Sequence, residues 1–180
     1  MRGRGSQVSP CAALLAAALV GSPAVAQSYE EAVRANLALV LEICIQGSDA
    51  LEWAAAFQTA GFIPSQRVHP EYGPVPIFLA PADTVVTEIH DERFGSGSCI
   101  AQTRHMGLNE AIPFVGAFVT QRYAGPGGFE RDTHNPDNPC AGYLMPFSEH
   151  SAMWLSFDSA DQPGACVEDG TARMTVSGPT

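Results

Sequence analysis

Residues 29–46, YEEAVRANLALVLEICIQ, decide the fold because their apolar members recur with the period of an α-helix. One stripe, at i, i+4, i+7, i+8 and i+11, consists of Val33, Leu37, Val40, Leu41 and Cys44. Leu39 and Ile43 widen this stripe, so we expect a well-buried helix that ends at Gly47. Glu30 and Glu31 stand in its first turn, where the helix dipole favours anions.

A second helix is predicted directly after the first, with well-marked ends. Asp49 and Glu52 have the spacing of a capping box at its start. Gly61 suits a left-handed residue at its end, which would let Phe62 pack on Phe57 as in a Schellman motif. The inner face is formed by Trp53, Ala56, Phe57 and Ala60. We interpret Trp53 as a core anchor rather than a ligand platform.

The remainder of the chain is rich in strand patterns. A further helix is expected from Asn109, and Gly125 to Pro139 is expected to form a long loop. The predicted strands are residues 75–80 at a sheet edge, 84–92, 99–105 after a turn at 95–98, 142–147, 152–157 and a hairpin at 165–176. The resulting order, α-α-β-β-β-α-β-β-β-β, predicts an α+β domain whose antiparallel sheet is interrupted by one further helix.

The first 26 residues have the three parts of a secretory signal peptide. Arg2 and Arg4 form a basic region, residues 11–20 form an apolar region, and small residues lead to a cleavage site at Ala26. The apolar region is about half the length that a membrane span needs. Cys11 precedes that region instead of following it, so no lipid anchor is expected. We therefore predict one mature domain, residues 27–180, without a membrane span.

The charge balance restricts the possible partners. The chain has 9 arginines, no lysine and 19 acidic residues, so loss of Arg2 and Arg4 leaves a formal net charge of −12. Nucleic acids and anionic membranes are excluded as expected partners, because both require neutralising cations. A basic protein, cations or simple solubility remain as explanations. The lack of lysine and the short Ala-rich signal peptide indicate a bacterial protein, hence a periplasmic or secreted one.

Cysteine usage agrees with export. Cleavage leaves four cysteines, which predict two disulfides with three possible connectivities. They are Cys44, Cys99, Cys140 and Cys166. No two of them have the close spacing of zinc ligands. A catalytic thiol is not expected either, because an oxidising compartment would consume it.

Part of the chain resembles small exported bacterial proteins of unknown function. The resemblance rests on Cys44 in a helix, on the helix end Ala60-Gly61-Phe62 and on the Gly-x-Cys-Ile strand at 97–100, and it covers residues 37–106. It implies no activity. It does imply that Cys44 and Cys99 are partners, and it says nothing about the other two cysteines. We predict a second bond between Cys140, which closes the Pro-rich loop, and Cys166, which begins the terminal hairpin, because this bond would anchor that loop.

Two groups of residues contain possible metal ligands, but neither has the spacing that favours a metal site. His90, with Asp91 and Glu92 beside it, and His105 would suit a metal ion if they met across the hairpin. The simplest register, centred on 95–97, instead places His90 nearer Gln102. The loop from Asp132 to Asp137 offers oxygen ligands for calcium, but its spacing lacks the EF-hand pattern and suits Asx-turns. No metal and no cofactor are expected.

Nucleophilic catalysis has no signature in the chain. There is no G-x-S-x-G motif, and Ser148 and His150 are only sequence neighbours. We therefore favour an acidic binding or accessory envelope module, for example an inhibitor or subunit that recognises a basic protein, over an enzyme. The alternative is a metal-dependent hydrolase that uses His90, His105 and the loop from Asp132 to Asp137.

Overall fold

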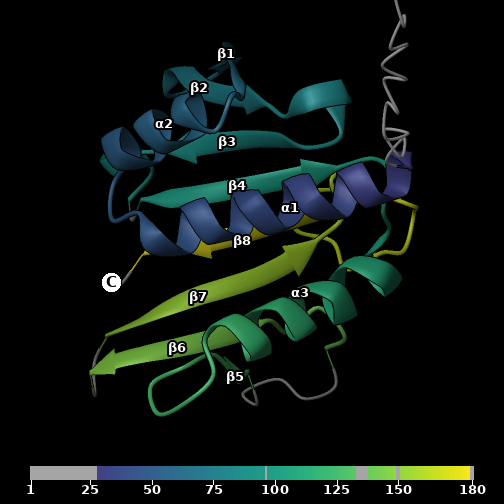
Figure 1. The fold of residues 1–180 in the computed structure, drawn as a ribbon. Coiled ribbons are helices and arrows are strands. Elements are labelled where there is room, and N and C mark those ends of the chain that lie inside the picture. Colours follow the sequence, from purple (N-terminus) through teal and green to yellow (C-terminus); the bar gives the residue numbers. More distant parts are fainter. Residues whose placement is uncertain (1–27, 96, 133–137, 149–150, 179–180) are drawn as a thin grey trace, which may run out of the picture.

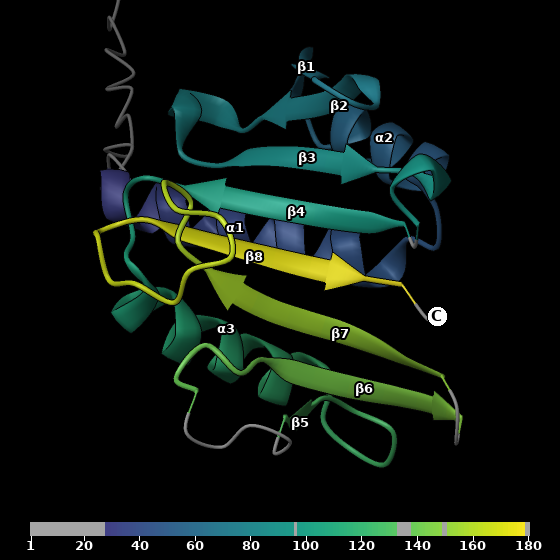
Figure 2. The same cartoon turned by 180° about the vertical axis from the view of Figure 1, so that it is seen from behind.

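The computed structural model describes residues 28–95, 97–132, 138–148 and 151–178. The expected signal peptide, residues 1–26, lies outside these described residues. Within them, three α-helices lie on one face of an eight-stranded antiparallel sheet (Figure 1), and the other face is seen from behind in Figure 2. The predicted α+β class, with two N-terminal helices and one later helix, is confirmed.

The elements follow the chain in a simple order. The helices are α1 (Tyr29–Gln46), α2 (Ala50–Thr59) and α3 (Leu108–Arg122). The first four strands are β1 (Ile63–His69), β2 (Gly73–Leu79), β3 (Val86–His90) and β4 (Ser98–Thr103). The last four are β5 (Glu130–Arg131), β6 (Tyr143–Ser148), β7 (Ser151–Asp158) and β8 (Ala172–Ser177).

The last strand closes the sheet at its centre. The spatial order is β1-β2-β3-β4-β8-β7-β6-β5, so β8 pairs with β4 on one side and with β7 on the other. Helix α1 packs on β4 and β8, and α3 packs on β7 (Figure 1). The helix layer and one sheet face therefore enclose a single core shared by both halves of the chain.

Helix α1 begins and ends where the sequence predicts. Ser28 is its N-cap and forms a reciprocal capping box with Glu31. All five residues of the predicted stripe are buried, and Leu37 is 0% exposed. Leu39, however, is 36% exposed. It lies away from the sheet, and no layer covers that side, so the expected wider burial is wrong at this position.

Both ends of α2 have the predicted caps, with one change at the start. The Asp49 carboxylate accepts hydrogen bonds from the N–H groups of Leu51 and Glu52. The Glu52 carboxylate bonds to Ser48 rather than back to Asp49. At the C-terminus Gly61 has φ of +83°, and the Phe62 N–H donates to the Phe57 carbonyl at 3.0 Å. The two Phe rings lie 5.2 Å apart, which confirms the Schellman contact.

The sheet edge differs from the expectation. Strand β2 was expected at the edge, but it pairs with both β1 and β3. The edge is β1, which lacks an alternating pattern because six of its seven residues are exposed. The prolines Pro74 and Pro76 are tolerated in β2 because β3 pairs only with residues 77–79, so no N–H is needed from either for that ladder.

The register of β3 and β4 is also different from the predicted one. His90 pairs with Ser98, and Val86 pairs with Gln102. A single turn of 3-10 helix, Glu92–Phe94, occupies the connection. The hairpin is therefore centred near Phe94 instead of at 95–97, which shifts every pair.

The predicted hairpin at 165–176 is not formed. Only β8 is a strand there, and residues 159–171 make a loop that follows β7. The Ser159 hydroxyl donates to Asp169, whose carboxylate also accepts from Thr171. These local side-chain bonds give the backbone an alternative to a strand, as Ser, Thr and Asp side chains often do.

Two disulfides join the layers and loops. Cys44 on α1 is bonded to Cys99 on β4, with Cα atoms 5.5 Å apart. Cys140 is bonded to Cys166, with Cα atoms 5.8 Å apart. Both expected pairs are confirmed, and two disulfides suit an extracytoplasmic protein. None of the helices in the described part of the chain has the length and apolar character of a membrane span.

Candidate functional site

The strongest polar cluster surrounds Glu88 on the sheet face that carries no helix. Glu88 and His90 are two residues apart on β3 and therefore point to the same face. The Glu88 side chain is only 2% exposed, although no helix covers it. Its Oε1 lies 2.6 Å from His90 Nε2, and its Oε2 is paired with the Arg67 guanidinium from β1. Gln102 on β4 donates weakly to Oε2 at 3.5 Å.

These contacts determine the charge state of Glu88. Burial opposes ionisation and raises the pKa of the carboxyl. The hydrogen bonds and positive charges of His90 and Arg67 together outweigh burial and hold the pKa of Glu88 below its usual value. Glu88 is therefore a buried carboxylate that stays ionised near neutral pH and orients both Arg67 and His90.

Aromatic rings enclose one side of this cluster. The His90 ring stacks on Phe94 with centroids 3.9 Å apart and planes inclined by 12°. Phe94 in turn contacts Tyr72 at 4.3 Å and His69 at 5.4 Å. Arg93 joins the 3-10 turn Glu92–Phe94 to the turn between β1 and β2, because its guanidinium donates to the Tyr72 carbonyl at 2.9 Å.

The geometry of this cluster suits a structural role, in which the side chains hold one another in place, better than catalysis of hydrolysis. A catalytic base needs a nucleophile within hydrogen-bond reach. Ser98 stands opposite His90 in the β3–β4 register. The described contacts of the His90 imidazole, however, are to Glu88 and to the Phe94 ring. We therefore interpret the cluster as a structural contact that links Arg67 on β1 to Glu88 and His90 on β3.

The structure does not bring the expected metal candidates together. His90 and His105 lie at opposite ends of the β3–β4 pair, because His90 faces Ser98 and His105 follows the end of β4. The five steps of strand from Ser98 to Thr103 correspond to about 16 Å, and His105 lies two residues beyond Thr103. His105 instead contacts the Tyr29 hydroxyl, 3.0 Å from its Nε2.

The loop candidates are only partly described. The Asp132 N–H donates to the Gly142 carbonyl at 2.9 Å. Asp137 and His150 lie outside the described residues. Within the described segments, no three His, Cys, Asp or Glu side chains come close enough to hold a metal ion.

A hollow of about 500 Å³ lies at the N-terminal end of α2. Asp49, Asp91, Glu92 and Arg93 line it, and the Arg93 guanidinium forms an ion pair with Asp91 at 2.9 Å. Leu51 also lines the hollow and is 83% exposed, the highest value among the large apolar side chains of the described residues. Carboxylates beside an exposed aliphatic group complement a lysine or arginine side chain, which has an apolar stem and a cationic end.

The described arginines are largely neutralised within the chain. Six of the seven form ion pairs with the chain's own carboxylates, at N–O distances up to 3.6 Å. They are Arg34, Arg67, Arg93, Arg104, Arg122 and Arg173. The seventh, Arg131, stacks over the Tyr143 ring. The acidic surplus is thus carried by carboxylates outside these pairs.

Sequence reasoning missed the centre of the polar cluster. It selected His90 with Asp91 and Glu92, which are adjacent in sequence. The informative pattern was Glu88-Ile-His90, because alternate strand residues share a face. Arg67 was missed together with β1, whose polar sequence carried no strand pattern.

Comparisons of the chain with protein-family models, with curated proteins and with solved structures found no match. The function is therefore inferred from the geometry and the charge of the described residues.

Proposed function

We propose that the protein is an exported, periplasmic or secreted binding module that recognises a basic protein, as an inhibitor or an accessory envelope subunit does. The observation that carries the proposal is the hollow at the start of α2, which is lined by the exposed Leu51, by three carboxylates and by a single arginine, so that negative charge is in excess there. It lies on a chain whose arginines are mostly paired internally. Complementary charge speeds association and favours cationic partners over anionic ones.

The proposed location rests on the signal peptide and the disulfides. We expect cleavage after Ala26, so that the mature protein begins at Gln27. Mass spectrometry of the protein from a periplasmic or culture fraction measures this directly. An intact Met1 in that soluble fraction contradicts the expected processing.

The binding test compares the wild-type mature protein with a variant in which the carboxylates of the hollow are neutralised. The variant Asp49→Asn/Asp91→Asn/Glu92→Gln keeps the side-chain shapes, and Asn at position 49 still serves as an N-cap. The matched control is Glu71→Gln/Glu130→Gln, which removes exposed charges from other parts of the surface. We expect the wild type and the control to capture the same basic protein from an envelope extract, and the hollow variant to lose it.

Salt provides a second readout of the same proposal. Surface charge pairs weaken as ionic strength rises, so capture should fall between 50 and 500 mM salt, a range over which the Debye length drops from roughly 14 to 4 Å. Equal capture by the hollow variant and the wild type would show that another surface binds. Failure to enrich any basic protein would count against the proposed function itself.

The alternative function is a metal-dependent hydrolase built on His90, His105 and the loop from Asp132 to Asp137. It has less support, because His90 and His105 stand at opposite ends of the β3–β4 pair.

A further inference from the structure

The loop of residues 159–171, which we call the strap, joins β7 to β8 and lies at one end of the uncovered sheet face (Figure 2). Internal bonds shape it: the Ser159 N–H donates to the Ala165 carbonyl at 2.9 Å, and the Ser159 hydroxyl bonds to Asp169. Its ties to the rest of the protein include the ion pair of Asp161 with Arg104 and the disulfide at Cys166.

The two disulfides differ in their access to solvent. Cys44 and Cys99 are 1% and 0% exposed, beneath α1. In the second disulfide Cys140 is 4% exposed, whereas Cys166 in the strap is an exposed residue. Thiol–disulfide exchange requires a thiolate to reach one of the sulfur atoms. Only the strap disulfide offers an exposed cysteine for this approach.

The strap also completes the start of α3. Gly107 is the N-cap of α3 and has no side chain to accept a hydrogen bond. Glu168, two residues after Cys166, supplies the missing acceptor, since the Asn109 N–H donates to its Oε2 at 2.6 Å. The contact is close, because a Cβ on Gly107 would lie 2.0 Å from Glu168 Oε1. A carboxylate at this position also interacts favourably with the helix dipole.

The strap forms walls of two hollows at this end of the sheet. Ala160 lines a hollow of about 370 Å³, and Glu168 with Gly170 lines a second of about 490 Å³. Arg104 and His105 contribute to both. Any displacement of the strap therefore changes the surroundings of these two side chains.

We propose that the Cys140–Cys166 disulfide is a thiol–disulfide exchange site at which a dithiol reductant releases the strap, uncaps α3 and opens the hollows beside Arg104 and His105. A thiolate of the reductant attacks the Cys166 sulfur and forms a mixed disulfide, while Cys140 leaves as a thiolate and takes up a proton. The second thiol of the reductant, as a thiolate, attacks its own partner sulfur in the mixed disulfide. Cys166 leaves and is protonated, so the protein gains two electrons and two protons and the reductant becomes a disulfide.

The first experiment measures which thiols appear. The folded mature protein is treated with limiting dithiothreitol, samples are alkylated over time, and peptides are quantified by mass spectrometry. We expect Cys140 and Cys166 to be labelled together, roughly tenfold or more faster than Cys44 and Cys99. Equal rates for all four thiols, faster labelling of the α1 disulfide, or no labelling before the protein unfolds would each overturn the proposal.

The second experiment measures the release of α3. After selective reduction and alkylation, hydrogen exchange at residues 108–111 should become faster while α1 stays protected. The oxidised variant Glu168→Ala should show the same local increase without reduction, and Glu71→Ala serves as the matched control. Unchanged exchange at 108–111 after reduction, or loss of the circular dichroism spectrum of the whole domain, would show that the disulfide does not act as a local strap.

Discussion

Replacing Glu88 by Gln tests whether the buried carboxylate stabilises the fold. The substitution keeps the shape of the side chain and removes the charge that binds His90 and Arg67. A hydrogen bond to a charged group contributes about 1.5–3 kcal/mol. The Arg67 side chain is 54% exposed and regains water when its partner is lost, so its ion pair adds at most about 1 kcal/mol. We expect a loss of about 2 kcal/mol, mainly from the bond to His90.

The pH dependence of this loss follows from the lowered pKa of Glu88. A carboxyl whose pKa is lower in the folded than in the unfolded state adds stability above the unfolded value of about 4.5. That contribution disappears as the pH falls through the folded pKa. The difference between the wild type and Glu88→Gln should therefore be full at pH 6–7 and shrink with acidification below about pH 4.5.

Urea unfolding of the mature, oxidised proteins at several pH values measures both effects. A double-mutant cycle of Glu88→Gln, Arg67→Gln and the double variant gives the coupling energy between Glu88 and Arg67. The rest of the stability lost in Glu88→Gln then belongs to the contact with His90 and to burial. A difference within about 0.5 kcal/mol at pH 7, or one that grows on acidification, would refute the reasoning.

Three further outcomes are expected. Gly142→Ala should lower the unfolding free energy by about 3 kcal/mol or more, because the added Cβ would lie 1.5 Å from the Leu155 carbonyl oxygen. In the same denaturation assay the control Gly178→Ala should be nearly neutral, because the nearest atom to its added Cβ is 3.8 Å away. Gly61→Ala should cost about 1 kcal/mol by thermal melting, entirely from its φ of +83°, because no atom lies within 4 Å of the added Cβ. Elemental analysis of the purified protein should show no stoichiometric zinc or calcium, and a tightly bound metal that is lost in His90→Ala would instead favour the hydrolase.

The parts of the fold that depend on local sequence were predictable. The apolar stripe of α1 and the Schellman motif at the end of α2 depend only on residues that are close in sequence, and the structure confirms both. The pairing of Cys44 with Cys99 followed from the resemblance rather than from local physics. The pairing of Cys140 with Cys166 was expected from the need to anchor the Pro-rich loop, and it is present although the expected hairpin at 165–176 is not formed.

The parts that depend on distant partners were not predictable. Strand β1 is stabilised by pairing along its whole length with β2, and its own sequence has no apolar alternation. The short 3-10 turn at Glu92–Phe94 decides the register of β3 and β4, and it depends in part on Asp91 accepting from the Arg93 N–H. The Glu88 site was not predictable for both reasons. Arg67 lies on β1, which had no strand pattern, and Gln102 lies near Glu88 only because the β3–β4 register differs from the predicted one.

The placement of charge on the two sheet faces indicates where a cationic partner would bind. On the face without helices, charges cancel across strands, because Arg67 pairs with Glu88 and Arg173 pairs with Asp158 at 2.8 Å.

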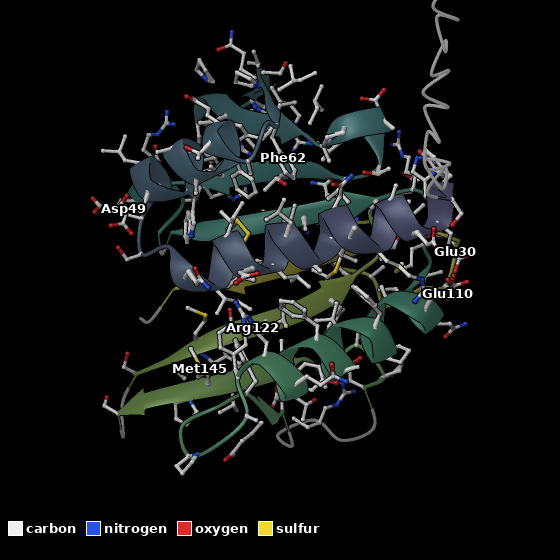
Figure 3. All side chains as sticks on the ribbon, viewed as in Figure 1. Glu30, Asp49, Phe62, Glu110, Arg122 and Met145 are labelled. Carbon is white, nitrogen blue, oxygen red and sulfur yellow. A yellow bond between two sulfur atoms is a disulfide. The ribbon has the colours of Figure 1, made fainter. Side chains whose placement is uncertain are left out.

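Several carboxylates outside such pairs stand instead where helices begin. Asp49 and Glu52 stand at the start of α2, and Glu31 at the start of α1. The starts of α1 and α3, marked by Glu30 and Glu110, lie at the opposite end of the molecule from Asp49 (Figure 3). Under the proposed function, we therefore expect a basic protein to be attracted to the ends of the helix layer rather than to the flat sheet. At the start of α2, the hollow beside Leu51 combines negative charge with exposed apolar surface.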